Sequence, residues 1–70
     1  MELEILGPTF KCSEDENVFF SRIYSLPGYD NVVGHGRYLY LTLKNNPDHS
    51  ALIQIQEICE FWNTEFRLLD

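Results

Sequence analysis

The sequence predicts one α+β domain over residues 1–70, a two-layer sandwich in which two helices cover one face of a four-stranded antiparallel sheet. Three observations lead to this fold class. Apolar and polar residues alternate at period two in several short segments. Apolar residues recur at helical spacing in two longer segments. Along the chain these segments follow one another as strand, helix, strand, strand, helix and strand.

The first strand and the first helix are well marked. Glu2–Leu6 alternates, with Leu3 and Ile5 expected inside and the two glutamates outside. Ser13 is expected to cap the helix that follows, with Glu16 three residues on in the capping-box position and a Pro-Gly pair at the end. One face of this helix is apolar and is expected in the core: Phe19, Phe20, Ile23 and Leu26.

The middle of the chain allows two interpretations. Tyr29–Val33 is expected to form a short strand that joins a longer strand, Arg37–Lys44, through a hairpin turn at Gly34–Gly36. Two glycines within three residues suit a turn that needs positive φ. In the alternative interpretation, the whole stretch 29–36 is a loop.

The second helix is expected to begin with Asn46 as cap and Pro47 in the first helical position, and to end near Asn63. Ile53 falls opposite the apolar stripe and is expected to be exposed. Thr64–Leu69 alternates again and predicts the last strand. The stripe comprises Ala51, Leu52, Ile55, Ile58, Cys59 and Trp62.

The order of these elements is the βαββαβ order of ferredoxin-like folds. This resemblance is one of topology, and many unrelated functions share it.

The strand Arg37–Lys44 carries the best functional clue. Its leucines point to one face, and two tyrosines and a threonine point to the other. Because the helices are expected to cover the leucine face, the tyrosine face is expected to meet solvent, where large rings suit a protein interface. In the alternative interpretation, the tyrosines only cover cross-strand neighbours and pair with an arginine. The candidate protein-binding residues are Tyr38, Tyr40, Thr42, Glu4 and Arg67.

Charge and composition narrow the classes of partner. Eleven acidic residues against five basic ones give a formal net charge of -6, which opposes non-specific binding to nucleic acid. A basic protein partner fits this charge better. No apolar run approaches the ~18 residues of a membrane helix, and no secretory signal is apparent. A cytoplasmic location, no membrane contact and two free thiols are therefore expected.

Residues 36–41, Gly-Arg-Tyr-Leu-Tyr-Leu, resemble in part the third strand of RNA-recognition motifs, where aromatic residues stand at alternate positions. The chain departs from that pattern, because Gly36 and Arg37 precede the first aromatic in place of the expected residues. The first strand also offers Glu2 and Glu4 where a stacking aromatic is expected. Carboxylates at these positions would repel phosphate, so RNA binding is not expected.

No constellation of residues predicts catalysis, a metal or a cofactor. His35 and His49 lack the spacing of a metal site, and Cys12 and Cys59 form no CxxC pair. Cys59 lies on the apolar stripe and is expected in the core. Cys12 precedes a helix start, but the acidic first turn opposes a thiolate there.

These observations favour a non-enzymatic protein-interaction module that uses the tyrosine face for homodimerisation or for binding another protein. Two alternatives remain open from the sequence. One is an acidic immunity-type or inhibitor-type protein that masks a cationic partner. The other is a regulatory domain that binds a small molecule near Gly7 or Gly34–Gly36, by analogy of fold.

Overall fold

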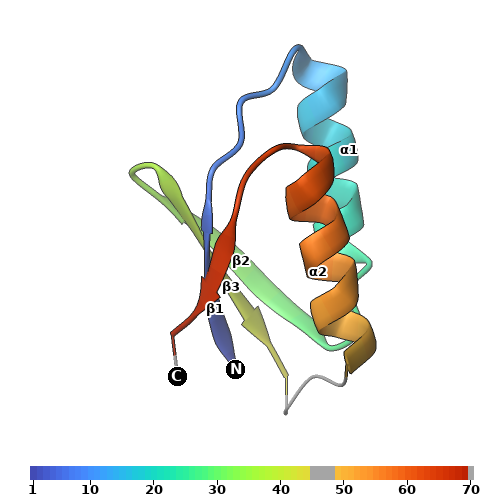
Figure 1. The fold of residues 1–70 in the computed structure, drawn as a ribbon. Helices are drawn as coiled ribbons and strands as arrows, with labels where there is room; N and C mark the ends of the chain where they lie inside the picture. Colours follow the sequence, from blue (N-terminus) through green and yellow to red (C-terminus); the bar gives the residue numbers. More distant parts are fainter. Residues whose placement is uncertain (45–48, 70) are drawn as a thin grey trace.

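The structure of the protein is a computed structural model that describes residues 1–44 and 49–69. The helices lie side by side on one face of the sheet, so the domain has two layers (Figure 1). The predicted α+β class, with a four-stranded antiparallel sheet, is confirmed. Neither helix in the described part of the chain is long and apolar enough to cross a membrane. The elements are β1 (Glu2–Leu6), α1 (Ser13–Tyr24), β2 (Tyr29–His35), β3 (Tyr38–Leu43), α2 (His49–Phe61) and β4 (Phe66–Leu68).

The strand order is β2-β3-β1-β4, and every neighbouring pair is antiparallel. β1 and β3 occupy the centre, while β2 and β4 form the edges. Glu4 on β1 lies opposite Tyr40 on one side and opposite Arg67 on the other. This register places one candidate binding residue from each of three neighbouring strands side by side: Tyr40 on β3, Glu4 on β1 and Arg67 on β4.

The core lies between the sheet and the helices. Leu3, Ile5 and Leu41 are fully buried, as the period-two pattern of the two central strands predicts. From the helices, Phe19 packs edge-to-face against Trp62, with ring centroids 5.2 Å apart. The stripe of α2 is buried as predicted except for Leu52, which is half-buried. On α1, Phe20 is also half-buried and packs against the edge of the core.

The stretch after α1 is a strand, so the loop interpretation is wrong. β2 runs as far as His35, and the turn lies at Gly36 and Arg37, one residue beyond the predicted Gly34–Gly36. Gly36 has φ +65°, whereas Arg37 is not among the residues with positive φ. Positive φ at only the first central residue is the pattern of a type II′ hairpin turn. Arg37 therefore belongs to the turn, and β3 starts at Tyr38.

The beginning of α1 also differs from the prediction. The cap position is Cys12, which makes no side-chain capping bond, and Ser13 is already helical. Asp15 in the first turn instead accepts from two donors outside the helix: its carboxylate accepts the backbone N–H of Lys11 at 3.1 Å and the indole N–H of Trp62 at 3.0 Å. Asp15 therefore stabilises the helix start and ties it to the residue that follows α2.

Of the two C-terminal elements, α2 ends near Asn63 as predicted, whereas β4 is shorter than predicted. α2 ends at Phe61, and Asn63 adopts a left-handed conformation with φ 56°, a common way to end a helix. β4 spans only Phe66–Leu68 of the predicted Thr64–Leu69. The predicted helix start at Asn46 and Pro47 lies outside the described residues.

The bond between Asp15 and Trp62 can be tested by Trp62→Phe. This substitution keeps most of the ring contact with Phe19 but removes the indole donor. We expect the free energy of unfolding to fall by about 1–2 kcal/mol, because a hydrogen bond to a charged acceptor is lost. The Tm would fall by roughly 4–16 °C for a domain of this size, measured by circular dichroism. As a control, Asp15→Asn keeps an oxygen acceptor, so it should lower the free energy of unfolding by less than Trp62→Phe does. An unchanged Tm in Trp62→Phe would contradict the stabilising role of the hydrogen bond between Asp15 and Trp62.

Candidate functional site

The face of the sheet that the helices leave uncovered, here called the open sheet face, is built by strand register. Side chains on one face recur every second residue, and residues that lie opposite one another across strands share that face. Two backbone hydrogen bonds extend the register beyond β4. The Leu6 N–H donates to the Glu65 carbonyl and the Leu69 N–H donates to the Glu2 carbonyl, both at 3.0 Å. Three rows result, written from β2 to β4: His35, Tyr38, Leu6, Glu65; Val33, Tyr40, Glu4, Arg67; and Asn31, Thr42, Glu2, Leu69.

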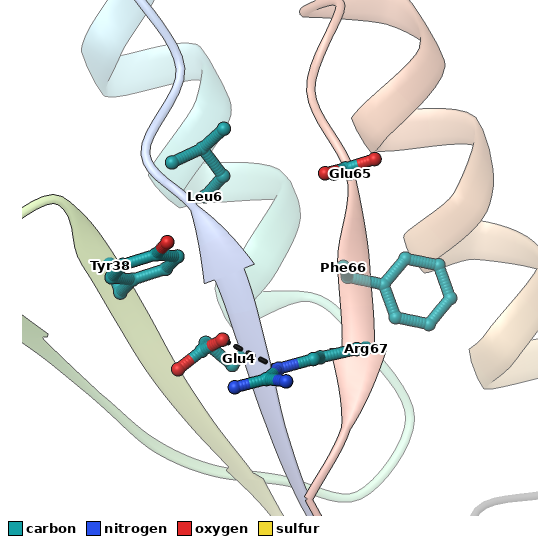
Figure 2. A pocket seen from close by; sticks show the side chains of 6 residues that line it. All are labelled: Glu4, Leu6, Tyr38, Glu65, Phe66 and Arg67. Atoms are coloured by element: carbon teal, nitrogen blue, oxygen red, sulfur yellow. Dashed lines mark hydrogen bonds and ion pairs between the residues drawn. The ribbon is translucent and has the colours of Figure 1, made fainter.

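The middle row contains a fixed ion pair. The Arg67 Nε donates to the Glu4 Oε1 at 2.7 Å across β1 and β4, as Figure 2 shows. The Glu4 side chain is only 12% exposed, whereas that of Arg67 is 71% exposed. A carboxylate that is largely covered needs its hydrogen-bond partners, so this pair holds Glu4 in place more firmly than a freely exposed pair would.

Tyr40 completes this row from the other side of Glu4. The pKa of the Tyr40 hydroxyl is raised above its ordinary value of 10.0, first by burial and then by a hydrogen bond and the negative charge of Glu4. The same carboxylate raises the pKa of the Arg67 guanidinium, through their hydrogen bond and then through its charge. Glu4 therefore acts on both of its neighbours in this row, a neutral phenol and a cation.

The first row is more apolar and more exposed. Tyr38 is 40% exposed and Leu6 is 37% exposed, and the two lie directly opposite each other on β3 and β1. Val33, in the middle row on β2, is 53% exposed. Tyr40 and Thr42 are half-buried. Exposed aromatic or aliphatic side chains therefore stand on three neighbouring strands of this face, β2, β3 and β1.

A shallow hollow of about 420 Å³ lies beside this apolar surface. Figure 2 shows Tyr38, Glu4 and Arg67 around it, while the ring of Phe66 points away toward α2. The hollow is open to solvent along the sheet, so it suits one side chain of a docking protein better than an enclosed small ligand. It is lined by Glu4, Leu6, Tyr38, Glu65, Phe66 and Arg67.

The structure places all five predicted binding residues on this one face: Tyr38, Tyr40, Thr42, Glu4 and Arg67. The sequence interpretation did not include Val33, because its face depends on where the hairpin turn falls, and the predicted turn was one residue too early. Nor did it foresee the Arg22 guanidinium on the helical layer, which lies 5.6 Å from the ring centroids of both Phe61 and Trp62. Phe61 is 71% exposed.

The other reactive side chains do not gather into a site. The His35 ring lies 6.5 Å from that of Tyr40, at the rim of the open sheet face. Within residues 1–44 and 49–69, no group of three or more His, Cys, Asp or Glu side chains is placed to hold a metal ion. Cys12 is exposed, whereas Cys59 is buried, and burial raises the pKa of its thiol to about 11.

The two cysteines should therefore differ in reactivity. In the folded protein at neutral pH we expect an aromatic disulfide reagent to modify Cys12 only, because the Cys59 thiol is neither exposed nor ionised. In denaturant both thiols should react, and Cys12→Ser should leave none reactive in the folded state. Rapid modification of two thiols in the native protein would contradict the burial of Cys59.

The coupling between Glu4 and Tyr40 predicts a pH dependence. A raised pKa means that the fold favours the neutral phenol, so its stabilising contribution is complete below pH 10.0 and is lost as the pH rises through the folded pKa. Glu4→Gln should lower the pKa of Tyr40 toward 10.0, as followed by NMR titration of the tyrosine rings. Glu65→Gln, which removes an acid from the same face, is the matched control. An equal Tyr40 pKa in the wild type and in Glu4→Gln would show that the carboxylate does not act on the phenol.

Comparison with known proteins gives no family for this chain: no protein-family model, no curated protein and no solved structure matches it.

Proposed function

We propose that the chain is a non-enzymatic protein-interaction module whose open sheet face, centred on Tyr38 and Tyr40, docks a protein. One observation supports this above the others. Tyr38, Leu6 and Val33 are exposed on three neighbouring strands, on a face that no helix or strand of the described chain covers. Tyrosine provides large contact area at low cost in side-chain entropy, and it is enriched among the residues that dominate binding energy.

The charges of the face favour a particular kind of partner. The face carries three carboxylates, those of Glu2, Glu4 and Glu65, and one guanidinium, that of Arg67. The whole chain carries a formal charge of -6. A partner with an apolar centre and a basic rim complements this surface. A second copy stacked on the same face would bring acidic rims together, so we favour a different protein as the occupant.

The ferredoxin-like arrangement belongs to the same proposal. In a split βαβ unit, another strand is inserted between the two strands that a helix connects. β3 lies between β1 and β2, which α1 connects, and β1 lies between β3 and β4, which α2 connects. Such a sheet leaves one face free when both helices lie on the other, which supports an open docking face.

A second candidate is an acidic inhibitor that binds a cationic protein through its helices. The exposed glutamates of α1 and α2 favour it: Glu14, Glu16, Glu57 and Glu60. Such a complex would weaken steeply with salt and would not depend on the tyrosines. These two properties separate it from docking on the open sheet face.

The double substitution Tyr38→Ala with Tyr40→Ala tests the proposal. We expect the wild type to capture a partner from native cell extract, and the double variant to bind that purified partner at least about 30-fold more weakly, because two central rings are removed. Titration calorimetry provides the measurement. Tyr24→Ala is the matched control, since Tyr24 is 55% exposed on α1, away from the face.

Circular dichroism would establish that the double variant remains folded. Equal affinity of the wild type and the folded double variant would overturn the proposal. A wild type that captures no protein would count against it as well.

A further inference from the structure

The two edges of the sheet differ in how they are protected. β4 is three residues long and carries Arg67. β2 is seven residues long, and after a register shift between Tyr29 and Asn31 it pairs without interruption from Asn31 to His35. This segment contains no Lys, Arg, Asp, Glu or Pro. Edge strands usually carry such residues, because their free backbone groups can otherwise pair with another chain.

Strand register identifies which backbone groups of β2 point outward. Leu43 exchanges hydrogen bonds with Met1, at 2.9 and 3.1 Å, so its backbone groups face β1. Along an antiparallel strand, the backbone N–H and C=O groups of successive residues point to alternate sides. The backbone groups of Leu41 and Leu39 therefore also point to β1, and those of the residues between them point to β2. In β2 the residues that pair with β3 are therefore Asn31, Val33 and His35.

The N–H and C=O groups of Val32 and Gly34 consequently point away from the sheet. No strand of the described chain lies beyond β2, and Gly34 is exposed. A row of outward backbone donors and acceptors at this spacing is complementary to another extended strand. The geometry therefore specifies a strand as the occupant of this edge.

We propose that β2 pairs antiparallel with β2 of a second copy, about a twofold axis at Val33, so that the two sheets become continuous. Val32 of one copy then lies opposite Gly34 of the other, and the outward groups of both residues are satisfied on both sides of the axis. Local charge does not oppose a second copy at this edge. Two chains of formal charge -6 repel each other overall, but the segment Asn31–His35 offers a contact that carries no formal charge at neutral pH.

The side chains on this axis are complementary as well. Val33 is 53% exposed on the open sheet face. In this register the two Val33 side chains form a non-hydrogen-bonded pair with Cα atoms about 4.5 Å apart, and β-branched residues pack well across strands. The axis is perpendicular to the sheet, so both open faces lie on the same side. Edge pairing thus leaves the open sheet face of each copy accessible to partners. The inference that β2 pairs with a second copy does not depend on the proposed function.

Amide hydrogen exchange on the full chain, followed by NMR at increasing protein concentration, tests the inference directly. The Val32 and Gly34 amides should exchange rapidly when dilute and at least about tenfold more slowly once light scattering shows a dimer. The Val33 and His35 amides should be protected throughout and serve as internal controls. A chain that stays monomeric at millimolar concentration overturns the proposal. A dimer in which the Val32 and Gly34 amides still exchange rapidly overturns it too.

Substitutions at the axis provide a second test. Val33→Lys places two cations side by side in the dimer and should yield a folded monomer, whereas Val18→Lys, at a valine 46% exposed on α1, should leave the dimer intact. In a Cys12→Ser background, Val33→Cys should form an intermolecular disulfide, since non-hydrogen-bonded pairs approach the separation that a disulfide needs. Val18→Cys is the matched control. A Val33→Lys dimer as stable as the wild type contradicts the proposal.

The Tyr38→Ala and Tyr40→Ala variant separates this inference from the proposed function. It should retain the dimer and the slow exchange of Val32 and Gly34, even where it loses a partner. Loss of the dimer in this variant, with exchange at Val32 and Gly34 unaffected by concentration in the wild type, would place self-association on the open sheet face instead.

Discussion

The structure depends on one constraint: the chain has enough apolar side chains and helices to cover a single face of its sheet. Leu3 and Ile5 on β1, with Leu41 and Leu43 on β3, are at most 1% exposed, and all four point toward the helices. Their burial supplies much of the driving force for folding. The other face is then left with the residues that alternate with them, so the tyrosine surface follows directly from the way the core is built.

Two carboxylates organise the two layers in different ways. Asp15 joins the start of α1 to Trp62 and thereby links the helices to each other. On the opposite face, Glu4 forms an ion pair with Arg67 and raises the pKa of Tyr40. The ion pair restricts the Arg67 side chain before any partner is present, and docking on the proposed binding face would then cost less conformational freedom.

Much of the fold was predictable because strand and helix periods differ. The pattern around Leu39, Leu41 and Leu43 indicated both the strand and its outward tyrosines, and the α2 stripe indicated a buried Cys59. Boundaries were harder to predict, because they depend on contacts between distant residues. Ser13 is a residue type typical of caps, yet the cap position is Cys12, and the first turn is held through Asp15, which accepts a hydrogen bond from Trp62 at a sequence distance of 47. The position of Val33 depended on a turn whose type only the backbone angle of Gly36 reveals.

The single tryptophan of this chain and its outward tyrosines lie in different layers. Trp62 is 8% exposed, edge-on to Phe19 and beneath the Arg22 guanidinium, whereas Tyr38 and Tyr40 stand on the far side of the sheet. The emission of the indole therefore reports on helix packing and on little else. The four tyrosines are divided between the layers, because Tyr24 lies on α1 and Tyr29 packs against the core. Tryptophan emission therefore follows the helical layer without any label, whereas the sheet surface is followed by the resolved ring signals of Tyr38 and Tyr40.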